Sequence, residues 1–259
     1  MLHQKRKYLV ENWNSKFPKN GTQTYIIGGN TYLNTVNKIR KEFKKRISIE
    51  VKPRENNDFS RKVELKISEH ELKLEPKLST LEEILLLTSS IYETVNLRVK
   101  HDGSILDVEN ELQIKQCWND IKEKLNKDYQ GSSIRRFINN IEHTLSSKKH
   151  IIENLIGYEL FGMLFNPIYK NYDSTKPLVI NKNKRISGGM ISVEEKFILE
   201  KIDKEENTVK LYLKGKLKTK DIEYSGYYKI NEENSWIKSV NIEIEEENNK
   251  STFWLKENK

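Results

Sequence analysis

Cysteine is almost absent from this sequence of 259 residues: Cys117 stands alone, which excludes a disulfide within the chain. Cys117 lies in a helical pattern on the same face as Ile114 and Ile121, so we expect a small buried residue rather than a reactive thiol. Long apolar runs are absent too. The longest helical one, Ile84–Leu87, is far shorter than the ~20 residues that span a bilayer.

The N-terminal residues 1–10 are basic, but they are not followed by the roughly 7 to 15 apolar residues of a secretory signal. We therefore expect a soluble, cytoplasmic protein. Apolar residues make up 36% of the chain and charged residues 32%. This length and composition allow a hydrophobic core in one large domain or two smaller ones.

Catalytic and cofactor-binding motifs are also lacking. The pairs Gly28–Gly29 and Gly188–Gly189 have neither the lysine of a phosphate loop nor the spacing of a dinucleotide-binding turn. No serine has the flanking glycines of a nucleophile elbow. His143 and His150 lie seven residues apart without a third ligand, so we expect no metal site. The sequence predicts no catalytic residues, no enzyme activity and no cofactor.

Strand patterns occur at both ends of the chain, with helical patterns between them. Apolar and polar residues alternate from Leu33 to Val51, where a helix before Phe43 stays an alternative. Alternation continues over Arg61–Leu74 and returns from Pro177 onwards. This order predicts an α+β fold: a strongly curved antiparallel sheet, formed by the N- and C-terminal strand blocks, packed against a central helical group.

The polar segment Asn171–Lys176 is the best candidate for a boundary between two parts of the chain. We assign residues 1–170 to β-hairpins and the central helical block. Residues 177–259 are assigned to an antiparallel β-meander, packed with the first part as one body.

The helical middle contains several amphipathic patterns. Ser79 and Glu82 form a capping-box pattern that opens a first helix. Further helices are expected from Asn110 and Ser133, followed by an apolar stripe over Ile151–Phe161. One shared core is predicted to contain Ile84, Leu85, Trp118, Ile121, Phe137 and Ile141.

Leu97–Val108 consists of two short alternating runs joined by Asp102 and Gly103. This dipeptide predicts a two-residue β-hairpin turn in which both residues have a positive φ.

Positive charge is concentrated at the N-terminal end. Residues 1–54 contain 13 lysines and arginines against three glutamates, whereas the whole chain has a net charge of +8. On the strand interpretation, four cations at even positions share one face, and we name these as candidate partner-binding residues: Lys38, Arg40, Lys44 and Arg46. Aromatic residues interleave with this basic region, as in proteins that bind single strands: Tyr8, Trp13, Phe17, Tyr25 and Tyr32.

Two functions remain open from the sequence. The first is a non-catalytic binding or assembly protein that engages a macromolecular partner through its sheet or basic N-terminal region. A protein partner is the main expectation, and nucleic acid is the alternative, without a recognised motif. The second function is a carrier or sensor that holds an apolar ligand between sheet and helices. Its basis is the layout, which resembles bacterial carrier and lipoprotein-type folds in which a half-open sheet wraps helices.

Overall fold

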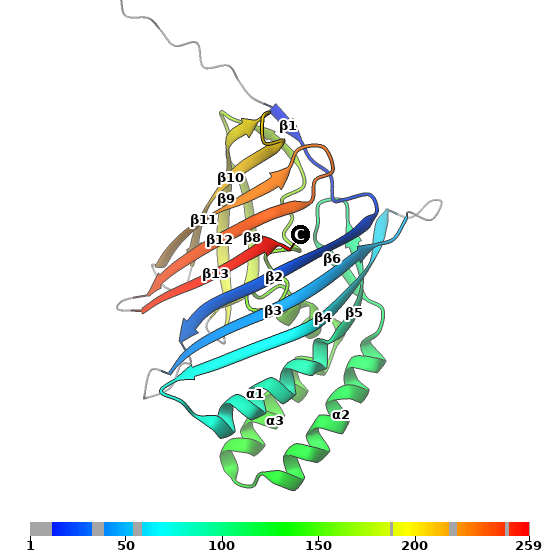
Figure 1. Ribbon diagram of the computed structural model, residues 1–259, viewed down its shortest axis with the longest axis vertical. Coiled ribbons are helices and arrows are strands. Elements are labelled where there is room, and N and C mark those ends of the chain that lie inside the picture. Colours follow the sequence, from blue (N-terminus) through cyan, green and yellow to red (C-terminus); the bar gives the residue numbers. More distant parts are fainter. Residues whose placement is uncertain are drawn as a thin grey trace, which may run out of the picture.

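The computed structural model describes residues 12–32, 39–53, 59–186, 189–217, 222–246 and 249–258. Within them, one antiparallel sheet of eleven strands dominates the fold (Figure 1). Its strands are β2 (Gly21–Tyr32), β3 (Arg40–Val51), β4 (Ser60–Glu75), β5 (Thr94–Lys100), β6 (Ile105–Val108), β8 (Leu178–Ile186), β9 (Gly189–Asp203), β10 (Thr208–Leu217), β11 (Ile222–Asn231), β12 (Ile237–Glu246) and β13 (Asn249–Glu257).

The spatial order of the strands is β6-β5-β4-β3-β2-β13-β12-β11-β10-β9-β8. Within each half, the paired strands are consecutive in the chain. The two halves meet where β13 pairs with β2, for example through Phe253 opposite Gly29. The α+β prediction is therefore confirmed, with both strand blocks in one sheet. The division into residues 1–170 and 177–259 stays a prediction about folding units.

The alternation of side chains gives the sheet a buried inner face and a solvent-facing outer face. On β3, Phe43, Lys45, Ile47 and Ile49 are buried, whereas the residues that alternate with them are half-buried or exposed. The strand interpretation is confirmed from Arg40 to Val51. Residues 33–38 lie outside the described part of the chain.

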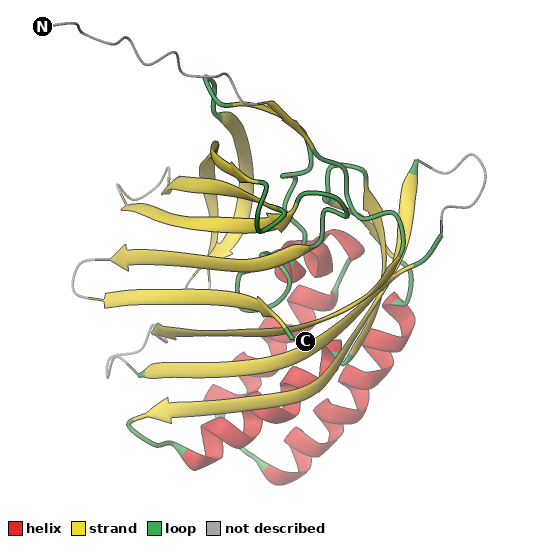
Figure 2. Cartoon of the chain, turned by 45° about the horizontal axis from the view of Figure 1, so that its top comes forward, coloured by secondary structure: helices red, strands yellow, loops and turns green. Residues whose placement is uncertain are grey.

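In the described part of the chain, four helices and one 3₁₀ turn lie on one side of the sheet (Figure 2). They are α1 (Ser79–Ser89), η1 (Ser90–Tyr92), α2 (Glu111–Asp128), α3 (Ser132–Leu145) and α4 (Lys148–Leu155). Helix α1 packs on β4, and α4 contacts both edge strands, β6 and β8. The predicted capping box is wrong, because Glu82 Oε1 instead accepts a hydrogen bond from the backbone NH of Leu74 at 2.8 Å.

The predicted helical core is confirmed in part. Ile84, Trp118 and Ile121 are buried. Leu85 is only half-buried, and Phe137 and Ile141 are partly buried against the core. These three side chains lie at the margin of the helical layer.

The apolar stripe after Ile151 does not continue as one helix. Helix α4 ends at Leu155, and residues 156–165 form turns. Tyr158, Phe161 and Met163 on these turns are fully buried. The segment 156–170 therefore fills the space inside the curved sheet.

The predicted boundary segment contains a short strand, β7 (Asn171–Asp173), which pairs with β1 (Asn12–Asn14). Trp13 stacks on Tyr172 with ring centroids 5.6 Å apart, and both are buried. The start of the described chain is thereby tied to the segment that leads into β8.

The turn between β5 and β6 contains four residues, His101 to Ser104, so the predicted two-residue turn is wrong. Gly103 has a positive φ of 89°, as predicted, but Asp102 does not. Instead, Asp102 Oδ1 accepts hydrogen bonds from the backbone NH (3.0 Å) and the hydroxyl (2.7 Å) of Ser104. A side-chain turn of this kind stabilises the connection without a second left-handed residue.

We expect Gly103→Val to lower the free energy of unfolding by more than the roughly 1–3 kcal/mol of a strained backbone. A Cβ at Gly103 would lie 2.6 Å from Tyr169 Cδ2 and 2.8 Å from the carbonyl oxygen of Asn166. Urea denaturation measures the loss. Gly131→Val is the matched control, because Gly131 also has a positive φ but its Cβ would meet nothing within 4 Å. Equal losses in both variants would show that crowding at Gly103 contributes nothing.

Candidate functional site

The predicted basic residues of β3 lie on the outer face of the sheet, but not as a row of unpaired charges. Each pairs across to a glutamate of β4: Arg40 with Glu75 (3.2 Å), Lys44 with Glu71 (3.2 Å) and Arg46 with Glu69 (3.0 Å). Such exposed pairs contribute about 0–1 kcal/mol each, so a competing anion displaces them at low cost. Lys38 lies outside the described residues.

Three aromatic side chains lie in one cross-strand line on the outer face, and we call them the aromatic row: Tyr212, Tyr227 and Trp254. Tyr212 is opposite Tyr227, which is opposite Asn241, which in turn is opposite Trp254. Tyr227 is 36% exposed. Trp254 lies against Gly28 of the next strand, where a Cβ would stand only 2.4 Å from the indole. The glycine thus allows the indole to lie against the sheet.

A lysine ammonium group lies over each ring of the aromatic row. The distances to the ring centroids are 5.5 Å for Lys210 over Tyr227, 6.0 Å for Lys214 over Tyr212 and 5.9 Å for Lys256 over Trp254. At exposed sites such contacts are worth about 0.5–1 kcal/mol. Each ring is therefore covered by a weakly held cation.

Parallel to the aromatic row runs a second line of side chains, the cation row: Lys210, Lys229, Lys256 and Arg46. The register places Lys210 opposite Lys229, with Ser239 between Lys229 and Lys256 and Ile26 between Lys256 and Arg46. Three of these cations have carboxylate partners: Glu200 for Lys210 (3.0 Å), Glu206 for Lys229, and Glu69 for Arg46 (3.0 Å). Lys256 has no ion pair with another described residue.

Sequence reasoning missed the aromatic row and, apart from Arg46, the cation row, although part of their signal was available. Tyr212, Tyr227 and Trp254 stand at the polar positions of their strands, between buried neighbours such as Leu211 and Leu213. An aromatic residue at the solvent-facing position of a strand is a candidate contact residue. The alignment across strands, however, depends on a register that no single sequence shows.

Three of the aromatic residues that interleave with the basic N-terminal region do not lie at the surface. Trp13, Phe17 and Tyr25 are buried and belong to the core. Tyr32 is half-buried, and Tyr8 lies outside the described residues. The single-strand interpretation is therefore wrong for Trp13, Phe17 and Tyr25.

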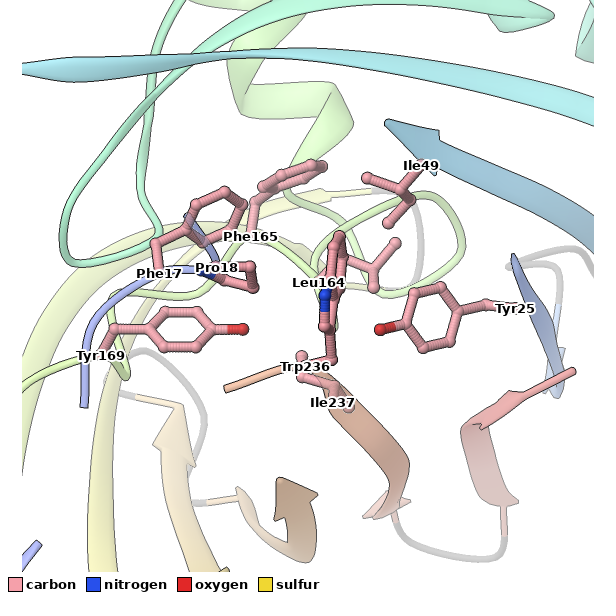
Figure 3. A pocket seen from close by; sticks show the side chains of 9 residues that line it. All are labelled: Phe17, Pro18, Tyr25, Ile49, Leu164, Phe165, Tyr169, Trp236 and Ile237. Atoms are coloured by element: carbon pink, nitrogen blue, oxygen red, sulfur yellow. The ribbon is translucent and has the colours of Figure 1, made fainter. Parts of the chain in front are cut away.

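A small pocket lies between the inner face of the sheet and the segment 164–169 (Figure 3). In the view, the hydroxyl groups of Tyr25 and Tyr169 point toward Trp236 from opposite sides. The space between the lining side chains is about 230 Å³ with open solvent included, and it has room for about one water molecule.

The hydroxyl group of Tyr25 is fully buried and has no hydrogen-bond partner among the described residues. The Ile237 backbone lies close to it without making a hydrogen bond of good geometry. Burial, followed by the neighbouring Tyr169, raises the pKa of Tyr25 well above its ordinary value. An unpaired buried hydroxyl is costly, which favours a polar occupant of this pocket.

A second interior site surrounds Glu195 on β9, whose side chain is 0% exposed. Its two carboxylate oxygens accept hydrogen bonds from Tyr158 Oη (2.6 Å), Tyr224 Oη (2.8 Å) and Asn166 Nδ2 (3.2 Å), and Lys182 Nζ lies 2.7 Å away. Burial and the charge of Glu195 raise the pKa of both tyrosines, which keeps them protonated as donors. This site is internally satisfied, and it joins β8, β9 and β11 to the segment 156–170.

Two lysines of β3 point to the inner face. The ammonium groups of Lys41 and Lys45 lie 5.8 and 5.6 Å from the centroid of the Phe43 ring. Lys41 pairs with the Glu159 carboxylate, and Lys45 donates to the Glu159 carbonyl oxygen at 3.2 Å. Burial, then the charge of Lys41, lowers the pKa of Lys45 to about 8, against an opposing effect of Glu159. Burial and the two lysines also lower the pKa of His70 to about 3.

We expect the contribution of Lys45 to stability to rise with pH between about 8 and 10, whereas the buried tyrosines, whose pKa values are raised, make stability fall near pH 10. The folded state loses the Lys45 proton near pH 8, whereas the unfolded chain keeps it to near 10.5, so the unfolded state binds more protons in this window. The full effect is on the order of 3 kcal/mol. Urea denaturation at pH 7 and pH 9, below the ordinary pKa of tyrosine, tests it, because Lys45→Met should remove the rise. The exposed neighbour Lys44 provides the control: a Lys44→Met variant that also loses the rise would contradict the assignment.

The remaining candidate groups do not assemble into a site. The rings of His143 and His150 lie 4.7 Å apart, but the described residues contain no group of three or more side chains arranged to hold a metal ion. Cys117 is half-buried and its thiol donates to the Ser90 carbonyl oxygen at 3.6 Å. Burial raises the pKa of this thiol, which disfavours the reactive thiolate. No helix in the described ranges is long and apolar enough to cross a membrane.

No protein-family model and no curated protein matches this sequence. Among solved structures, the chain is similar to one described as lipid–protein interactions in lipovitellin, with a TM-score of 0.46 and 12% sequence identity. The similarity covers 93% of this chain and 25% of that chain, so this chain spans about a quarter of its length.

Proposed function

We propose that this chain is a non-catalytic binding protein that engages a negatively charged macromolecule across the outer face of its sheet. The observation that carries the proposal is the pair of in-register lines on that face, the aromatic row and the cation row. Aromatic side chains are enriched at contact surfaces because they combine large apolar area with few rotatable bonds. The cation row supplies the opposite charge to an anionic partner.

The cations of the outer face can exchange their contacts within the protein for contacts with a bound polyanion at little cost in free energy. The ion pairs of the cation row are exposed and the lysine–ring contacts are weak, so each contributes about 1 kcal/mol or less. A polyanion that meets four cations at once gains several such contacts together and releases its counterions. The pocket at Tyr25 and the site around Glu195 are less suited to bind a macromolecule, because their polar groups are enclosed or already paired.

Binding to heparin, a soluble polyanion, tests the proposal. We expect affinity to fall steeply with salt, and to fall at least tenfold in Lys210→Glu/Lys256→Glu. Lys44→Glu/Arg46→Glu tests the predicted β3 residues separately. Both variants should fold, because the side chains lie on the outer face. Lys149→Glu, at an exposed position on α4, is the matched control. Salt-independent binding, or an equal loss in the control, would contradict the proposal.

The second candidate function, a carrier or sensor that holds an apolar ligand between sheet and helices, remains because the hydroxyl group of Tyr25 in the small pocket has no hydrogen-bond partner among the described residues. A small ligand with one polar group could bond Tyr25 and Tyr169, provided that Trp236 moves to enlarge the enclosed space. Calorimetry with phenol as the probe tests this: we expect binding that Tyr25→Phe weakens. Absence of binding at millimolar phenol would remove this candidate.

A further inference from the structure

We propose that the outer face binds single-stranded nucleic acid, with bases stacked on the aromatic row and phosphates on the cation row. This inference rests on the proposed function and names its partner. The two rows are two residues apart along each strand, which separates them by roughly 7 Å. From Tyr212 to Trp254 the aromatic row crosses three strand spacings, roughly 14 Å, enough for a short run of nucleotides.

The lysine over each ring has a second role in this arrangement. When a base stacks on the Tyr227 ring, Lys210 leaves the ring face and turns toward a phosphate. Both the ring contact and the pair with Glu200 are surface interactions worth a factor of about five or less. Stacking of one base on an aromatic side chain is worth a factor of roughly 5 to 150. The exchange is therefore favourable at each ring.

Other anionic polymers use only half of this surface. An acidic peptide pairs with the cation row, but its carboxylates have no planar face to stack on Tyr212 or Tyr227. Duplex DNA carries phosphates as well, but its bases are already stacked inside the helix. Only a single strand supplies phosphates and free base faces together.

The test is fluorescence anisotropy of a labelled oligothymidine of about 12 nucleotides, with duplex DNA and polyglutamate as comparison ligands. We expect the oligothymidine to bind most tightly, with a slope of log K against log salt of about −3 for four phosphates. Tyr227→Ala/Tyr212→Ala should weaken oligothymidine binding at least 20-fold and leave polyglutamate binding unchanged. Tyr227→Phe/Tyr212→Phe keeps the rings and should restore binding to within about threefold.

Contact of a base with Trp254 should also quench its fluorescence, and the quenching should disappear in Trp254→Phe, which keeps a ring. If polyglutamate binds as tightly as oligothymidine and the alanine variant binds both normally, this inference fails while the proposed function stands. Equal binding of duplex DNA also overturns the inference. If none of the three ligands binds, the inference and the proposed function both fail.

Discussion

Replacing Lys182 by methionine is expected to lower the free energy of unfolding by about 3–5 kcal/mol, because it leaves a charged carboxylate buried without its cation. Glu195 is wholly inaccessible to solvent, and Lys182 Nζ lies 2.7 Å from its Oε2. Lys182 also donates to Asn166 Oδ1, so the substitution removes two contacts of one polar cluster. Urea denaturation of the variant at neutral pH measures the loss.

The double variant Lys182→Met/Glu195→Gln tests the cause of that loss. It removes both charges, so most of the stability should return, because a neutral amide is far cheaper to bury than a carboxylate. Lys210→Met provides a surface comparison: its pair with Glu200 is half-exposed, and the loss there should stay below about 1 kcal/mol. A double variant as unstable as the single one would show that packing, and not charge, dominates at this site.

Truncation of Trp118 to alanine is expected to cost about 3–5 kcal/mol, because it opens a large cavity in the helical layer. Trp118 is only 3% exposed and lies on α2 beside the buried Ile114 and Ile121. Thermal and urea denaturation should agree on the loss. Leu112→Ala on the same helix is the control, because Leu112 is 82% exposed and the change should stay within about 0.5 kcal/mol. Equal effects of the two substitutions would place Trp118 outside the core.

Much of the secondary structure could be predicted from the sequence because each element has its own repeat of apolar residues. The period of two predicted β3 over Arg40–Val51, and the period near 3.6 predicted α2 and α3. Residues 156–165 could not be predicted in this way. They are apolar because they lie inside the curved sheet, and turns that are buried on all sides have no periodicity.

The predicted binding residues of β3 show how far sequence alternation can predict a surface. Alternation correctly placed Arg40, Lys44 and Arg46 on one face of β3 and the lysines Lys41 and Lys45 on the opposite face. It could not show that glutamates of β4 stand opposite the first three. That pairing depends on the register of two strands, which shifts between Arg46 and Ile47. The aromatic row, which spans β10 to β13, depends on three such registers.

The pairing of β2 with β13 has a consequence for how the chain folds. Each half of the sheet consists of neighbours along the chain, and all of these neighbours except β4 and β5, which α1 separates, close short loops and form quickly. The junction joins residues such as Tyr25 and Glu257, which are more than 200 positions apart, and closing so long a loop is entropically costly. We therefore expect the two halves to form first and their union to limit the folding rate. Until then, both β2 and β13 expose an unpaired edge that can add strands of another molecule.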